Sequence, residues 1–331
     1  MGRQNVKKRE QMGSSSSGEL KGKILVRVRR ESCSVFYILD LDTGRVSANP
    51  HRLLDYGSLG TMVSLGSVVY VIGKPSVYEY GNSIPRERAE DAHNGASYLD
   101  LSKPQIGWKN AAPMFCDELS PDCVSLWGKL YAFRGSLWYC LGEVFNPKRN
   151  QRHRLLKPPV SGEFLVSPPV IADPLNNRIL VHLQNNSSIY AYYPDADRWD
   201  CLVEAFGGWC RKMVCVDGVI YMHCSKLKGM VMAYDLASKQ LLDVAVSSEF
   251  ESPLTSRQFH SIFHRGNGLL CLVSCLRKNG PSGADDGHDV VHVVEFKAEL
   301  KNNPKQVLVT PVSSKFYPLD SRCRVTQYLL I

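Results

Sequence analysis

The residues best suited to hold a metal ion lie in the segment Asp285-Asp286-Gly287-His288-Asp289-Val290-Val291-His292. Because side chains alternate between the two faces of an extended strand, His288 and His292 would share one face of a strand that began before His288. Imidazoles and carboxylates at this spacing allow metal coordination. Glycine and aspartate before a Val-Val run are also typical of a loop that enters a strand. We therefore expect a loop and a strand here, and no metal site.

The cysteines give little indication of thiol chemistry. The chain has 11 of them, an odd number, with no CxxC pair and no hydrophobic signal peptide before them. This usage is typical of an intracellular protein with reduced thiols. Cys271 and Cys275 would share one face of a strand, but a disulfide needs a geometry that spacing alone does not provide. Their apolar neighbours favour packing in the core.

Motifs for nucleotide and acyl-transfer chemistry are missing from the sequence. It contains no P-loop, no GxGxxG loop and no GxSxG elbow. We therefore expect a protein that is not an enzyme and that needs no cofactor.

A tight-turn signal followed by a β-rich run occurs six times along the sequence. Asparagine, aspartate and glycine at such turns favour the positive φ angles of a two-residue hairpin. The turns recur about every 49 residues, a period within the range of four-stranded propeller blades. They lie at Gly22, Gly66-Ser67, Trp127-Gly128, Asn176-Asn177, Asp217-Gly218 and Asn267-Gly268.

A second landmark, a strand that ends in a polar turn, follows each hairpin. The two landmarks divide each unit into strands a to d, joined by an a-b turn, a b-c loop, a c-d turn and a d-a crossing. We therefore predict an all-β fold, a six-bladed β-propeller. The second landmark occupies residues 38–44, 98–101, 144–147, 191–194, 233–236 and 294–296.

The first unit has no strand a of its own, since a Ser-rich stretch precedes Gly22. The last segment, residues 324–331, is a strand without a turn partner after it. We predict that this segment pairs with residues 24–29, so that the first blade contains both ends of the chain and the ring is closed. The predicted domains are a flexible tail over residues 1–19 and a propeller over residues 20–331.

This pattern resembles plant kelch-repeat proteins, including the propeller half of F-box/kelch proteins. The resemblance covers residues 20–331; the family's Gly-Gly is reduced to Ile72-Gly73 and Arg134-Gly135, and its blade tryptophan occurs at Trp108 and Trp199. It implies a protein-binding adaptor or substrate-recognition module linked to ubiquitin ligases. No F-box precedes the first unit in this sequence, so the resemblance is to the recognition half alone.

Some plant kelch propellers are iron-dependent specifier proteins with a Glu-x3-Asp-x3-His arrangement. Here Glu87 and Asp91 keep the first spacing, but Gly95 stands in place of the histidine. Copper oxidases on kelch propellers use paired Tyr and His ligands, and no feature of this sequence indicates such ligands either. A metal-dependent or small-molecule-binding propeller enzyme is left as the alternative function.

Loop length suggests which face of the propeller binds a partner. The a-b and c-d turns are mostly short, whereas the b-c and d-a connections include the long polar stretches 81–95, 158–169, 247–256 and 277–289. Long loops on a rigid scaffold often carry binding residues. We therefore expect a protein partner on the b-c/d-a face. The candidate contacts are Trp209, Arg211, Arg257, His260, Arg86 and Arg88, where arginine and tryptophan are typical of binding hot spots.

The charge pattern sets further expectations for partners and location. The formal net charge is +8, with basic residues scattered among acidic ones, which weakly favours acidic partners. The basic stretch 148–154 lacks interleaved aromatic residues, so we do not expect nucleic-acid binding. No apolar stretch is long enough to cross a bilayer. We expect a monomer in the cytoplasm or the nucleus.

Overall fold

A computed structural model gives the fold of the chain. It describes residues 22–30, 33–54, 60–73, 95–115, 120–133, 141–160, 165–207, 213–224, 230–246, 259–277, 289–302, 305–319 and 324–331.

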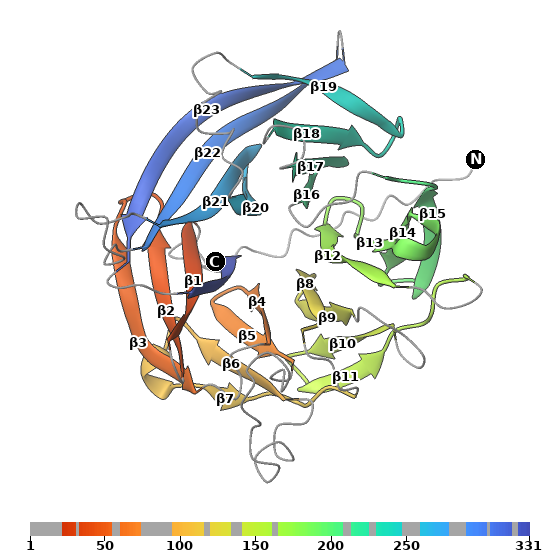
Figure 1. Cartoon of the computed structure of the whole chain (residues 1–331). Helices are drawn as coiled ribbons and strands as arrows, with labels where there is room; N and C mark the ends of the chain where they lie inside the picture. Colours follow the sequence, from red (N-terminus) through yellow and green to blue (C-terminus); the bar gives the residue numbers. More distant parts are fainter. Residues whose placement is uncertain are drawn as a thin grey trace, which may run out of the picture.

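The fold is all-β, with small antiparallel sheets arranged around a common centre, consistent with a β-propeller (Figure 1). Two short 3-10 helices, η3 (Pro104–Ile106) and η4 (Gln184–Asn186), lie among the described strands. In the described part of the chain, no helix has the length and apolar character needed to span a membrane.

Four of the sheets contain four strands each. The first contains β24 (Arg324–Leu330), β1 (Lys23–Arg30), β2 (Cys33–Asp40) and β3 (Val46–Leu54). The second contains β4 (Thr61–Leu65), β5 (Val68–Ile72), β6 (Ala96–Asp100) and β7 (Lys109–Asn110). The third contains β8 (Asp122–Leu126), β9 (Lys129–Phe133), β10 (Gly142–Asn146) and β11 (Gln151–Arg154). The fourth contains β12 (Val166–Asp173), β13 (Arg178–Leu183), β14 (Ser188–Tyr193) and β15 (Arg198–Val203).

The fifth sheet has eight strands and joins two antiparallel sets of four. One set is β16 (Met213–Val216), β17 (Val219–Cys224), β18 (Met230–Asp235) and β19 (Gln240–Val246). The other is β20 (Phe259–Gly266), β21 (Leu269–Arg277), β22 (Asp289–Asn302) and β23 (Lys305–Pro318). The sets meet where β19 runs parallel to β23, from Asp243 opposite Gln306 to Val246 opposite Val309.

The long strand β22 corrects the predicted end of the sixth unit. The sequence placed a polar turn at residues 294–296, but β22 continues to Asn302 and pairs with β23 over its whole length. Phe296 is fully buried. Its burial, together with the additional pairing of β23 with β19, explains why the strand does not end there.

Three of the predicted hairpins are two-residue turns with both residues at positive φ. They are Trp127-Gly128, Asp217-Gly218 and Asn267-Gly268, with φ of 48° and 76°, 49° and 80°, and 52° and 71°. These angles are those of the turn type that matches strand twist.

The predicted turn at Asn176-Asn177 is longer than expected. The turn between β12 and β13 covers Pro174 to Asn177, with Asn177 at φ 48°. Pro174 has no backbone N–H to donate, so the antiparallel ladder ends at the pair Asp173 and Arg178.

The polar turns between the third and fourth strands are held by a recurring side-chain bond. The Asp40 carboxylate accepts hydrogen bonds from the backbone N–H groups of Asp42 and Thr43, at 3.1 and 2.7 Å. The bond from Thr43 is the main cause that lowers the pKa of Asp40. Asp100 accepts from Ser102, and Asn146 from Lys148, in the same way. Such local bonds explain why Asp and Asn end these strands.

The last strand pairs with the first, as predicted from the sequence. β24 runs antiparallel to β1, from Ile24 opposite Leu330 to Arg29 opposite Arg324. Gln327 of β24 also reaches the next sheet, where its side chain accepts from the Met62 N–H at 2.8 Å and donates to the Met62 carbonyl at 3.1 Å.

The core consists of apolar clusters between neighbouring sets of strands. Phe133, Val181 and Trp199 belong to a cluster between the sheet of β8 to β11 and the sheet of β12 to β15. Val26 and Val293 belong to another, between β1 to β3 and β20 to β23. This packing fixes the sheets against one another and so holds the turns at their edges in place.

Candidate binding pocket on the turn face

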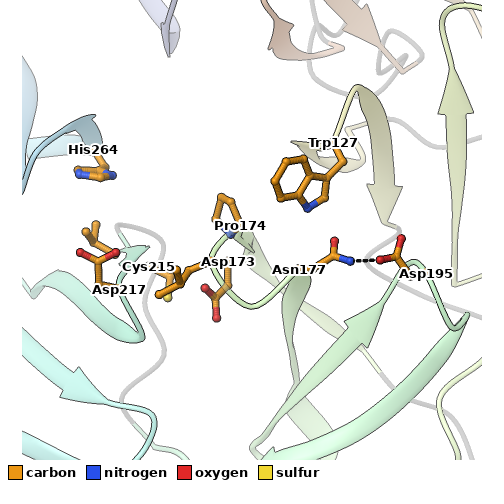
Figure 2. A pocket seen from close by; sticks show the side chains of 10 residues that line it. Trp127, Asp173, Pro174, Asn177, Asp195, Cys215, Asp217 and His264 are labelled. Atoms are coloured by element: carbon orange, nitrogen blue, oxygen red, sulfur yellow. Dashed lines mark hydrogen bonds between the residues drawn. The ribbon is translucent and has the colours of Figure 1, made fainter. Parts of the chain in front are cut away.

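Antiparallel alternation brings the turns between first and second strands, and those between third and fourth strands, to one side of the molecule. We call this side the turn face. It carries a pocket of about 820 Å³, formed by the β8–β9, β12–β13, β14–β15 and β16–β17 turns and by β20 (Figure 2). A volume of this size is within the usual range for ligand pockets.

Trp127 forms one wall of the pocket and is 67% exposed. It stands at φ 48° in the β8–β9 turn, where the matching turns have Asp217 and Asn267. Asparagine and aspartate tolerate this left-handed backbone, but a bulky aromatic residue there is an outlier. A largely exposed indole on a strained turn brings little net benefit for folding, and strained positions of this kind cluster at functional sites.

The β12–β13 turn adds a second apolar side chain, Leu175, which is 70% exposed. The turn is anchored from below by Asp173, whose buried carboxylate accepts hydrogen bonds from Asn176 at 2.9 Å and from Arg178 at 2.7 Å. The ion pair with Arg178 compensates the charge of Asp173. Leu175 is thus presented by a turn that is held in place.

Asp195 enters the pocket from the β14–β15 turn and is exposed. One of its carboxylate oxygens accepts a hydrogen bond from the Asn177 side chain, drawn as a dashed line in Figure 2. Burial raises the pKa of the nearby Tyr131 to about 12, and the negative charge of Asp195 acts in the same direction. The bond fixes Asp195 without neutralising it.

Asp217 and His264 lie on the side of the pocket opposite Trp127, with Pro174 between (Figure 2). The Asp217 side chain is exposed and has no ion-pair partner among the described residues. Burial lowers the pKa of His264 below its usual 6.5, although the charge of Asp217 opposes this shift. Within the described chain, the His264 Nε2 atom is buried without a hydrogen-bond partner. His264 is therefore neutral near pH 7.

Cys215 lines the pocket but is not prepared for nucleophilic chemistry. It is buried, and burial raises the pKa of its thiol to about 12, so the thiolate is scarce at neutral pH. The pocket combines exposed apolar surface with two available carboxylates. No Lys or Arg occurs among the described residues that line it.

The binding residues predicted from the sequence are not tested by this geometry. Five of them, Trp209, Arg211, Arg257, Arg86 and Arg88, lie outside the described residues. His260 lies near the start of β20, and its side chain is outside the description. The sequence did not predict the pocket, because loop length favoured the b-c/d-a face as the binding surface. A signal for it was present: tryptophan where a two-residue turn favours Asn, Asp or Gly.

The described part of the metal-site candidate has a structural role. His292 lies in β22, stacked on Phe316 with ring centroids 4.3 Å apart, and its Nε2 is 2.9 Å from the Ser314 hydroxyl. His288 lies outside the described residues. The described part of the chain contains no group of three or more potential ligands for a metal ion.

The other chemical candidates also have structural roles. Cys271 is buried, burial raises its pKa to about 12, and neither Cys271 nor Cys275 is in a disulfide bond. In the basic stretch 148–154, Arg152 is buried and pairs with Glu143 at 2.7 Å. Arg154 lies over the Phe115 ring, 5.6 Å from its centroid.

Comparison of the chain with protein-family models and with curated protein sequences found no match.

Proposed function

We propose that this chain is a protein-binding module, a six-bladed propeller of the kelch type that acts as an adaptor or substrate-recognition subunit. The observation that carries the proposal is the turn-face pocket, where Trp127 and Leu175 expose apolar surface and the turn that carries Leu175 is anchored by Asp173. Tryptophan in a partly enclosed site is typical of residues that dominate binding energy.

The grouping of the strands supports the proposed blade number. β1 to β24 fall into six sets of four when the eight-stranded sheet is divided at the β19–β23 junction. The pairing of β24 with β1 supports closure through both ends of the chain. As an adaptor, the module would present a bound protein to an effector such as a ubiquitin ligase.

The pocket favours a partner on the turn face over the b-c/d-a face predicted from loop length. The two faces can be separated by substitution. We would purify the tagged full chain from its native tissue in three forms: wild type, Trp127→Asn with Leu175→Ser, and Arg211→Ala with Arg257→Ala. Mass spectrometry would compare the proteins recovered with each form.

The proposal predicts that the turn-face double variant loses at least one partner that the wild type recovers, while the arginine double variant keeps it. Unchanged far-ultraviolet circular dichroism would show that both variants are folded. Retention of every partner by the turn-face variant would overturn the proposal. Loss in the arginine variant alone would restore the b-c/d-a face.

A further inference from the structure

We infer that the turn-face pocket binds a basic peptide segment of a partner protein, with its lysine or arginine side chains placed against the Trp127 ring and the carboxylates of Asp195 and Asp217. The inference rests on the proposed protein-binding function and adds the chemistry of the partner. It gives the module a preference opposite to the acidic partners that its net charge suggests.

The charges of the pocket point to a cation. Asp195 and Asp217 are both exposed, and they come from turns of neighbouring strand sets, so their charges converge from two sides. Asp173 does not contribute because Arg178 compensates it. The described lining contains no Lys or Arg, in a chain whose formal net charge is +8. Such local reversal of charge attracts a positively charged group.

Trp127 makes the site selective for a cation carried on an apolar stem. An ammonium or guanidinium group over an indole face is attracted by the ring's negative quadrupole. The carbon stems of lysine and arginine can at the same time lie against Leu175 and Pro174. A simple metal ion would gain nothing from this apolar surface.

The size of the pocket favours a peptide segment over a single small cation. Its volume of about 820 Å³ accommodates several side chains, and it is bordered by turns from different strand sets. A short extended segment with spaced basic residues could contact Asp195 and Asp217 together. A lone amino acid could contact only part of the lining.

Fluorescence anisotropy with labelled peptides tests the inference on the full chain. The probe is a peptide of alternating arginine and serine, and the reference peptide has glutamine in place of each arginine. The variants are Asp217→Asn, Asp195→Asn and Trp127→Asn. Asp243→Asn is the matched control, because Asp243 is an exposed carboxylate on β19 that does not line the pocket.

We expect the arginine peptide to bind the wild type, and each pocket substitution to weaken binding about fivefold. Asp243→Asn should change the affinity by less than about twofold. Equal binding of the glutamine peptide, or equal binding by all three pocket variants, would overturn the inference.

Three further outcomes show which part of the account fails. If native partners still depend on Trp127 but the arginine peptide does not bind, the proposed function stands and the basic chemistry is wrong. If neither the recovery of native partners nor the binding of the arginine peptide depends on Trp127, the assignment of binding to the turn face is wrong. A large gain in peptide affinity on replacing Lys7, Lys8 and Arg9 by alanine would make the chain's own basic segment the occupant, and would overturn assignment to a partner.

Discussion

At the scale of a single residue, we expect Trp127 to be required for partner binding but not for the stability of the fold. The left-handed backbone costs tryptophan about 1–2 kcal/mol, and asparagine tolerates it better. The covered part of the indole contributes stability of similar size. We therefore expect Trp127→Asn to leave the free energy of unfolding within about 1 kcal/mol of the wild type while partner binding is lost. Urea denaturation measures the first quantity. The buried Trp199 is the comparison, and Trp199→Ala should cost about 3–5 kcal/mol. Equal losses at the two positions would assign Trp127 to the fold.

His264 predicts a pH dependence of binding, also at the residue scale. Its pKa lies below 6.5, so the ring is neutral at pH 7 and becomes a cation as the pH falls through that lowered value. Asp217 is the described charged group that acts on it. The new cation would compete for Asp217, so affinity for the arginine peptide should fall below pH 6.5. Anisotropy titrations at stepped pH measure this fall, and His264→Gln should remove it. A fall that persists in His264→Gln would contradict the role of His264.

At the scale of elements, Gln327 of strand β24 allows a test of how much the link between neighbouring sheets stabilises the fold. Its amide exchanges two hydrogen bonds with the Met62 backbone, which links the first sheet to β4 of the next. Gln327→Ala removes both and leaves the Met62 groups to find other partners. We expect a loss of about 1–3 kcal/mol in the free energy of unfolding, measured by urea denaturation. Gln184→Ala, at an exposed glutamine in η4, should change it by less than about 0.5 kcal/mol. A loss no larger than that of Gln184→Ala would show that this link does not stabilise the fold.

The elements that were predictable from the sequence are those determined by local chemistry. The residue types of the turns Asp217-Gly218 and Asn267-Gly268 predict their positive φ angles. Asp40 and Asp100 mark their turns by accepting backbone bonds nearby in sequence. The parallel pairing of β19 with β23 was not predictable, because contact between two edge strands depends on how whole sheets pack. The pocket was missed for a similar reason: its lining comes from four turns and β20, which only the packed sheets bring together.

At the scale of the whole molecule, the pairing of β24 with β1 connects the first and the last described strands. Removing residues 320–331 would leave the backbone groups of β1 unpaired along an edge, and exposed edges promote association. We expect the truncated chain to unfold at a lower temperature and to elute as larger species in size-exclusion chromatography with light scattering. Deletion of residues 1–19, which the sequence predicts to be a tail, should change neither result. A monomeric truncated chain with an unchanged melting temperature would contradict the proposed closure.

The most direct test of the turn face is hydrogen–deuterium exchange of the full chain, alone and with a partner recovered by the wild type. We predict slower exchange on binding at residues 126–129, 173–177 and 216–218, which lie in three of the turns that form the pocket. Exchange in residues 81–95 and 277–289 should not change. Protection confined to those two stretches, with the turns unaffected, would contradict the claim that the partner binds at the turn face.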